Sequence, residues 1–145
     1  MRTAYRVIAN AIAAGVVLQA AFIAYGFFQQ LHEVDGGKTL QKGYEDNAGQ
    51  VLHGFLGFMV FPLLALALLV VAFLTRLPEA LRWAGLVLLV TVVQILLAVA
   101  GTSVPALGAL HGINAFVLAG VASMAARRVA TAEGAIAGTA GTSAL

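Results

Sequence analysis

Four apolar stretches, each long enough to cross a bilayer, occupy most of this chain. They run over residues 5–28, 50–75, 79–100 and 107–128. About 20 apolar residues in a helix cross a hydrocarbon core, and within lipid a helix satisfies every backbone group internally. Hydrophobic residues make up 61% of the sequence and charged residues 10%, which lies outside the range of soluble domains. The sequence therefore predicts an all-α membrane protein, a four-transmembrane-helix antiparallel bundle.

The positions of the prolines agree with these predicted helix boundaries. Pro78 is expected to open the third helix, and Pro105 lies in the short link before the fourth. Both are usual places for proline, which is favoured near a helix N-terminus. Pro62 falls inside the second stretch, where its missing backbone N–H predicts a kink.

Two segments lie outside the predicted helices. The long link 29–49 holds the turn signal Asp35-Gly36-Gly37-Lys38, and we expect it to form an outer loop. The last stretch, 129–145, is rich in Ala, Gly and Thr and is expected to be a disordered cytoplasmic tail. The transmembrane domain is therefore predicted over residues 1–128.

The positive residues predict how the chain is oriented. Six positive residues lie near the N-terminus, the second link and the C-terminus: Arg2, Arg6, Arg76, Arg82, Arg127 and Arg128. Only Lys38 and Lys42 lie in the long link. Because positive residues concentrate on the cytoplasmic side, we expect both termini in the cytoplasm (N-in/C-in) and a multi-pass protein of the bacterial cytoplasmic (inner) membrane. The two helical hairpins then run in the same sense, as a parallel repeat.

The two halves of the chain carry the same polar motif within apolar sequence. Gln19 stands seven residues before Gly26, as Gln94 does before Gly101. Later in each half comes the pattern Leu-His-Gly-x-x-small-Phe, which holds His53 in the first half and His111 in the second. We expect the two histidines at equal depth on diagonal helices, so that both imidazoles point at one central position.

A symmetric pair of histidines is the arrangement that a bis-histidine haem requires. Neutral imidazole is a good iron ligand, so His53 and His111 are predicted to ligate the iron of one haem b near the outer leaflet. Small neighbours would let a flat ring approach the helix backbones. The other predicted cofactor-binding residues are Gln19, Gln94, Gly54, Gly57, Gly108, Gly112 and Ala115.

The same residues have structural interpretations. Glycines also serve close helix packing in membranes. The glutamines and Asn114 are equally suited to hydrogen bonds between helices, and a His–His or His–Gln bond could lock the bundle without a cofactor. Lys38 and Lys42 could pair with haem propionates or remain solvated loop charges.

Several kinds of chemistry are excluded. The chain has no cysteine, which excludes disulfides, thiolate metal sites and c-type haem attachment. No carboxylate lies inside a predicted span, since Glu79 is the first residue of the third, and this argues against a proton relay or an ion-coupled transporter. No hydrolase, transferase or nucleotide-binding motif is present, so no catalytic residue is predicted.

At these motifs the chain resembles a family of uncharacterised bacterial four-helix membrane proteins, known only as a domain of unknown function. The likeness covers about residues 4–128. It rests on the early Val-Leu-Gln, the outer His-Gly, the later Val-Gln and the final Leu-His.

The whole pattern is also similar to one half of haem A synthase, which has two four-helix halves with histidines opening the second and fourth helix of each. Its third-helix Leu-Gln-x-x-Leu-Gly pattern resembles the segment that begins at Val93-Gln94 here. This resemblance implies that His53 and His111 are the axial ligands of one haem b. The family's catalytic half has a glutamate where Gln50 stands here, and a glutamine cannot ionise, so haem A synthesis is not implied.

Two functions from different classes remain. The first is a small b-type cytochrome or haem-binding protein for electron transfer or haem handling. The alternative is a haem-free accessory or assembly subunit of a larger respiratory or transport complex in the membrane. A quinone or lipid carrier would need a pocket lined by Gln19 and Gln94. The expected partners are the lipid bilayer together with a quinone, a redox protein or such a complex, and no nucleic acid, because no basic stripe with interleaved aromatics occurs.

Overall fold

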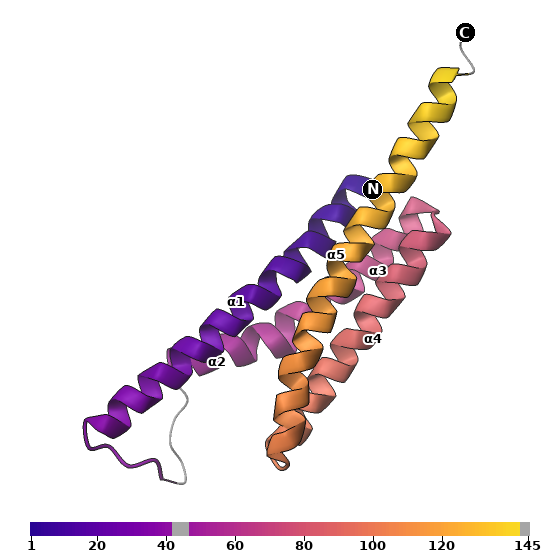
Figure 1. Ribbon diagram of the computed structural model, residues 1–145. Helices are drawn as coiled ribbons and strands as arrows, with labels where there is room; N and C mark the ends of the chain where they lie inside the picture. Colours follow the sequence, from indigo (N-terminus) through magenta and orange to yellow (C-terminus); the bar gives the residue numbers. More distant parts are fainter. Residues whose placement is uncertain (42–46, 143–145) are drawn as a thin grey trace.

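The chain is all helical over the parts that this computed structural model describes, residues 1–41 and 47–142, with side chains described as far as Thr131. Its elements are α1 (Arg2–Asp35), α2 (Ala48–Phe55), the π-helical turn η1 (Leu56–Val60), α3 (Phe61–Thr75), α4 (Pro78–Gly101) and α5 (Pro105–Thr142) (Figure 1). Because α2, η1 and α3 follow one another without a break, the chain contains four long helical segments. The all-α prediction is confirmed over the described residues.

These four segments are long and apolar enough to cross a membrane. Many of their large apolar side chains face outwards; Val17, Phe73 and Phe116 are 70%, 62% and 79% exposed. An apolar surface of this extent is unfavourable in water but matches lipid, which is as apolar as leucine. The fold is therefore consistent with a multi-pass membrane protein whose helices contact the bilayer.

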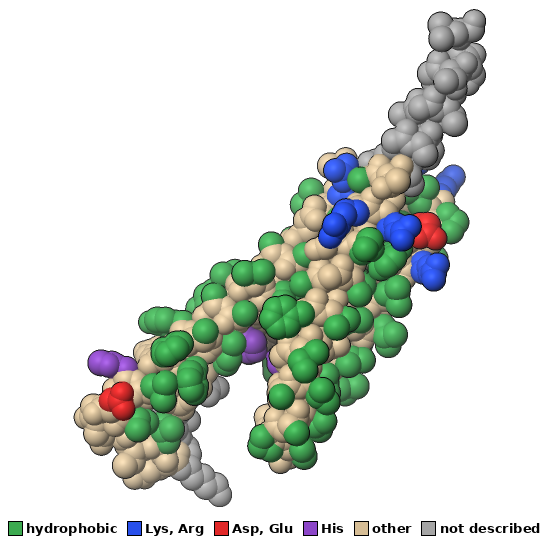
Figure 2. All heavy atoms as spheres, viewed as in Figure 1, with side chains coloured by type: hydrophobic (Ala, Val, Ile, Leu, Met, Phe, Trp, Pro, Cys, Tyr) green, Lys and Arg blue, Asp and Glu red, His purple; other side chains and the backbone are tan. Residues whose placement is uncertain are grey.

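The two ends of the molecule differ in how closely the helices pack. At one end, α3 lies against α1 and α4, and α5 lies against α1 and α4. At the other end, Figure 1 shows two separate arms: α2 packs against α1 in one, and α5 packs against α4 in the other. We call these the packed end and the open end. In Figure 2 the blue side chains gather at the packed end. They are arginines, because both lysines of the chain belong to the link between α1 and α2.

The buried core at the packed end is built mainly from small residues. Alanines at Ala9, Ala65, Ala84 and Ala122 are completely buried, and small side chains let membrane helices approach closely. Tyr5 is also buried, and its hydroxyl donates a hydrogen bond of 3.0 Å to the backbone oxygen of Ala80. This bond satisfies the one polar group of a side chain that is otherwise surrounded by apolar atoms.

The buried positions of α1 and α4 correspond one for one. The matched pairs are Ala9 and Ala84, Ile12 and Val87, and Val16 and Thr91. Continued at the same spacing, the series reaches Gln19 and Gln94, then Gly26 and Gly101. The repeat in the sequence is therefore also a repeat in which side chains face inwards.

The second helical segments of the two hairpins, α2–η1–α3 and α5, match in the same way, except that α2–η1–α3 contains one extra residue. From His53 to the buried Ala65 there is one residue more than from His111 to the buried Ala122. The turn η1 lies within this stretch and accommodates the extra residue, because a π-helical turn bonds one residue further along the chain. Pro62 comes two residues after the end of η1. The helix predicted to be kinked at this proline thus contains a π-helical turn shortly before it, and the kink itself stays a prediction.

Two predicted boundaries were wrong. The first helix was expected to end at residue 28, but α1 continues to Asp35, because the sequence from Gln29 onwards contains good helix formers. It ends at Gly36 and Gly37, where Gly37 has a φ of +92°, a conformation that favours glycine. The predicted turn there is confirmed, whereas the segment 29–49, predicted as an outer loop, is helical over residues 29–35 and from Ala48 onwards.

The fourth helix was also expected to end too early. The disordered tail predicted over 129–145 is instead helical to Thr142, as part of α5. Alanine, the residue with the highest helix propensity, recurs through this segment, so a helix already formed in α5 can continue. Residues 143–145 lie outside the described residues, as does Lys42. Pro78 begins α4, as predicted. Pro105 was expected in the link before the fourth helix but is the first residue of α5.

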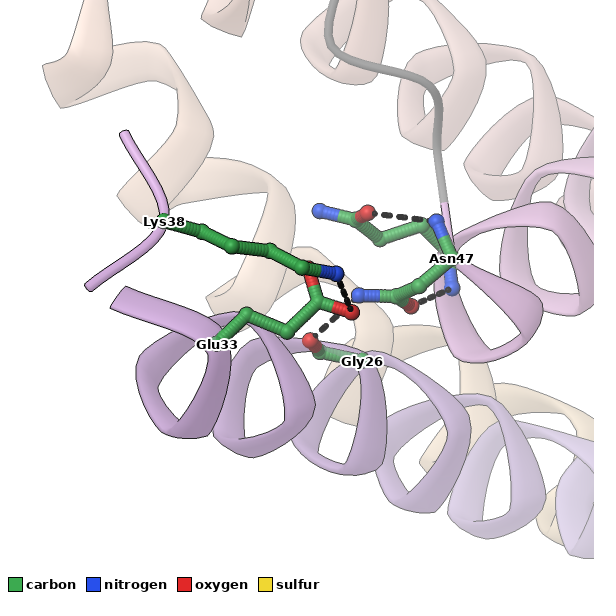
Figure 3. A network of polar contacts seen from close by, with 5 residues as sticks. Gly26, Glu33, Lys38 and Asn47 are labelled. Atoms are coloured by element: carbon green, nitrogen blue, oxygen red, sulfur yellow. Dashed lines mark hydrogen bonds and ion pairs between the residues drawn. The ribbon is translucent and has the colours of Figure 1, made fainter. Parts of the chain in front are cut away.

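The start of α2 is tied to α1 by polar contacts, drawn in Figure 3. Asn47 and Gln50 form a capping box, in which each side chain accepts a hydrogen bond from the backbone N–H of the other. Asn47 also donates 2.7 Å from Nδ2 to the backbone oxygen of Gly26. The capping box gives Gln50 a structural role at the N-terminus of α2. Nearby, Nζ of Lys38 lies 3.5 Å from the carboxylate of Glu33.

Candidate functional site

An apolar cleft of about 410 Å³ lies between the two arms. Figure 2 shows the notch between them, with histidine side chains at its base. All four long helices contribute to its walls. The lining residues are Val16, Val17, Gln19, Ala20, Ile23, His53, Gly54, Gly57, Phe58, Phe61, Thr91, Gln94, Ile95, Ala98, His111, Gly112, Ala115, Phe116, Leu118 and Ala119. Every predicted cofactor-contacting residue except Gly108 is among them.

The two histidines come from different arms and meet in this cleft. His53 belongs to α2 and His111 to α5. Their ring centres are 6.1 Å apart, and the ring planes meet at 70°. Both rings are only half-buried, because one side of each faces the cleft. No hydrogen bond between the two rings is found in the described structure, so the two arms are not locked by a His–His bond.

Each histidine is held by the helix that precedes it in its own hairpin. Nδ1 of His53 lies 3.1 Å from the backbone oxygen of Gln19, and Nδ1 of His111 lies 2.9 Å from the backbone oxygen of Gln94. A carbonyl oxygen only accepts, so Nδ1 carries the hydrogen in both rings. The other nitrogen, Nε2, then holds the lone pair of a neutral imidazole. The predicted His–Gln hydrogen bond exists, but it forms within each hairpin.

The side chains of the two glutamines act differently. Gln94 Nε2 lies 3.2 Å from Nε2 of His111. Gln19 Nε2 instead donates 3.0 Å to the backbone oxygen of His53. The Gln19 Oε1 atom is buried and has no hydrogen-bond partner among the described residues. The repeated motif therefore produces the same backbone contact twice but two different side-chain contacts.

Asn114 accounts for this difference. Its Nδ2 donates to the backbone oxygen of Val90 at 3.1 Å and to Oε1 of Gln94 at 2.7 Å. Leu56 occupies the matching place in the first hairpin, three residues after its histidine. A leucine cannot donate a hydrogen bond, so Gln19 has no equivalent support. The sequence placed Asn114 near the cavity, and the structure shows that it acts through Gln94.

The small residues divide into two groups. Gly54 and Gly112 line the cleft, and a methyl group added to either would meet no atom within 4 Å. Gly57 and Ala115 also line it. Gly108, in contrast, lies where α4 and α5 cross: a Cβ added to Gly101 would come within 2.8 Å of its Cα. For Gly108 the structural interpretation, close helix packing, is the one that the contacts favour.

The remaining polar candidates lie away from the cleft. Lys38 is paired with Glu33, and neither it nor His32 contributes to the lining. Within residues 1–41 and 47–131, no three His, Cys, Asp or Glu side chains gather in a group that could hold a metal ion. Any metal in the cleft would therefore depend on the two imidazoles and on further ligands supplied by the bound group itself.

Sequence reasoning missed several apolar walls of the cleft. Phe58 and Phe116 were part of the repeated motif but received no role, and Val16 and Ile23 were not considered. The repeat spacing could have found them, because they lie three or four residues from Gln19 or at the end of the histidine motif.

Comparisons with known proteins found no relative. No protein family matches the chain, and neither a search of curated proteins nor one of solved structures found a match.

Proposed function

We propose that the chain is a small integral-membrane haem-binding protein, a b-type cytochrome in which His53 and His111 bind one haem iron from opposite sides. One observation carries the proposal. Two imidazoles from separate arms face the same apolar cleft with their ring centres 6.1 Å apart. The hydrogen bonds within each hairpin do not explain why the two rings face each other.

The distance between the rings fits a shared metal ion. A metal bonded to one nitrogen of each ring at about 2 Å, with the radius of each ring added, separates the ring centres by about 6 Å. An edge-to-face contact between the two rings would give a similar separation, so the distance is compatible with a shared metal but does not by itself require one. The Nδ1 hydrogen bonds leave Nε2 of each ring as the donor atom, and such bonds orient metal-binding histidines and raise their basicity.

The walls of the cleft also suit a flat apolar ligand. The volume of about 410 Å³ lies within the range of small-molecule sites, about 300–1,000 Å³. The open space over Gly54 and Gly112 adjoins both imidazoles. Phe58 and Phe116 offer aromatic surface at corresponding places in the two arms. Apart from the two histidines, the two glutamines and Thr91, the lining side chains are apolar.

A haem with two imidazole ligands carries one electron at a time and keeps no open coordination position, which favours electron transfer or haem handling over oxygen activation. The chain itself supplies the two lone pairs, holds each ring through a backbone carbonyl and keeps water from the cleft with apolar walls. Among the described lining residues, the two histidines are the only titratable side chains, and in this proposal both serve as ligands. We therefore assign no catalytic residue.

The proposal includes a membrane arrangement. The four segments form an antiparallel bundle of two hairpins, with both termini and the arginine-rich packed end in the cytoplasm of a bacterium. Three features support this orientation: the gathering of arginines at the packed end, the rule that positive residues face the cytoplasm, and the contact of Arg128 with the ring of Trp83 at 5.8 Å, since tryptophan is typical of the membrane interface. The histidines then lie towards the outer leaflet.

The visible spectrum of the purified protein tests the proposal. Expressed with adequate haem and purified in detergent, the protein should show a Soret band and, when reduced, the sharp α-band of a low-spin b-type haem. His53→Ala and His111→Ala should each abolish the six-coordinate spectrum, whereas His32→Ala, a histidine outside the cleft, should leave it unchanged. A colourless protein that copurifies with a larger membrane complex would overturn the proposal and favour the accessory-subunit alternative.

A further inference from the structure

The two histidines of the cleft are held differently, and this difference bears on how a ligand would enter. His53 presents Nε2 to the cleft with no hydrogen-bond partner for that atom among the described residues. His111 has a partner at both nitrogens, since Gln94 accepts from Nδ1 through its backbone oxygen and approaches Nε2 with its side chain. The Nε2 lone pair of His53 is therefore free of hydrogen bonds from the described residues, whereas that of His111 accepts one from Gln94.

The direction of each hydrogen bond around His111 follows from the backbone. The oxygen of Val90 only accepts, so the atom of Asn114 that faces it is the amide nitrogen. The same nitrogen faces Oε1 of Gln94, which sets the orientation of the Gln94 amide. The Nε2 of Gln94 is therefore turned towards His111, where its N–H donates to the Nε2 lone pair. Val90, Asn114 and Gln94 together form a latch on His111.

We infer that the two axial positions are not equivalent: His53 is the first and permanent ligand, and His111 is an exchangeable ligand that the Asn114–Gln94 latch holds in reserve. This inference rests on the proposed function. For His111 to bind an iron, the hydrogen bond from Gln94 Nε2 to His111 Nε2 would have to break, so that the same lone pair could form the coordinate bond. No proton would be transferred, because the hydrogen stays on His111 Nδ1, where it is donated to the Gln94 backbone oxygen. Gln94 and Asn114 are positioning residues, since they act through His111.

A haem bound at this site would be held by His53 alone while Gln94 stays bonded to His111, and by both histidines once that hydrogen bond is broken. The second state is the six-coordinate form of the proposed function, and it is the one expected when no other ligand is added. A small neutral ligand for ferrous iron, such as carbon monoxide, would therefore compete with His111 and not with His53. A symmetric site, in which both histidines are held alike, would give no such preference.

Removing the latch tests the inference. Asn114→Leu places in the second hairpin the residue that the first hairpin has at Leu56. Because a hydrogen bond between membrane helices contributes about 0.6 kcal/mol, or about threefold in an equilibrium, we expect the loss of Asn114 to weaken carbon monoxide binding to the ferrous protein by about threefold to tenfold. Thr102→Val, a polar-to-apolar change in the same hairpin outside the cleft, should leave that affinity unchanged.

The haem-free protein provides a second readout. Nitrogen-15 NMR of the imidazoles should show an unengaged Nε2 for His53 and a hydrogen-bonded Nε2 for His111, with Nδ1 protonated in both. Asn114→Leu should move the His111 Nε2 signal towards that of His53. In the haem-loaded protein, His111→Ala should retain a five-coordinate haem, whereas His53→Ala should lose most of it.

The outcomes separate the two claims. Equal Nε2 signals in the haem-free protein, an unchanged carbon monoxide affinity in Asn114→Leu, or equal haem loss from both histidine variants would overturn the ligand order and leave the haem proposal standing. A wild-type protein that binds no haem would overturn the proposed function, and the ligand order with it.

Discussion

The two hairpins of this protein build the same contact in two different surroundings. In each, a histidine Nδ1 donates to the backbone oxygen of a glutamine on the preceding helix. In each, a glycine of that helix lies against a glycine of the next: Gly26 against Gly49, and Gly101 against Gly108. Only the first hairpin has a π-helical turn, and only the second has an asparagine that supports its glutamine.

In both hairpins the backbone contact fixes where the imidazole ring lies, whereas neighbouring side chains determine whether its Nε2 lone pair is available to a ligand. The contact between histidine Nδ1 and the glutamine backbone oxygen depends on the distance between two helices, so it forms in both hairpins. The contact of the glutamine side chain differs between them, because the first hairpin has Leu56 where the second has Asn114. Similar geometry at two sites is therefore compatible with different availability of the two lone pairs.

The largest effect is expected where backbone touches backbone. In Gly49→Ala the new Cβ would lie 2.5 Å from both the nitrogen of Gly26 and the oxygen of Phe22, so the helices must separate. Gly101→Ala meets Gly108 at 2.8 Å and should cost less. We expect a loss of about 1–3 kcal/mol in the free energy of unfolding, greater at Gly49, measured by thermal unfolding in detergent.

Gly85→Ala is the control for this pair, because a Cβ there meets no atom within 4 Å. It should leave stability unchanged or raise it slightly, as alanine favours a helix. Equal stability of all three variants would mean that the glycine contacts do not hold the hairpins together.

A smaller effect is expected at the start of α2. Asn47→Ala removes the helix cap and the bond to the oxygen of Gly26, and should lower the free energy of unfolding by about 1 kcal/mol. The second hairpin enters α5 through Pro105 instead, so Ser103→Ala in its link should change stability little. Parallel thermal unfolding curves of the two variants measure the difference. A matching loss in Ser103→Ala would show that the links of the two hairpins are equivalent.

The smallest effect is expected from giving the first hairpin the asparagine of the second. In Leu56→Asn the new amide can donate to the unpartnered Oε1 of Gln19 and turn the Gln19 amide towards His53. The gain should be only about 0.6 kcal/mol, so we would follow the nitrogen-15 signal of His53 Nε2, with Leu56→Met as the apolar control. A His53 signal that stays unengaged in Leu56→Asn would show that Asn114 needs more than its place in the repeat.

The sequence was sufficient for the helices and for most of the cleft, for a physical reason. Apolar length predicts a span, and a repeat places matched residues at matched positions, so His53, His111, Gln19 and Gln94 could all be assigned to one site. The haem itself stays a prediction. Gly108 could not be separated from the lining glycines, because a glycine that packs and one that borders open space have the same sequence pattern.

Two other features, the turn η1 and the partner of Asn114, could not be predicted from the sequence. The turn η1 left no sequence signal other than Pro62, because in lipid an apolar helix has no polar face whose spacing would reveal an extra residue. The link from Asn114 to Gln94 joins two helices, and a single polar residue in a span does not say which neighbour it contacts. The Ala-rich end of α5 was misjudged because composition was weighed without helix propensity.

The π-helical turn has a consequence for the helix on either side of it. Each residue of an α-helix advances the side chains by about 100° around the axis, so one residue gained or lost at η1 changes the phase of α2 relative to α3. If η1 tightened into α-helical geometry while α3 kept its place, His53 would rotate out of the cleft towards lipid. The core around Ala65 and Leu68 would be undisturbed. The pairing of the two imidazoles thus depends on a single wide turn that neither ring contacts through its own hydrogen bonds.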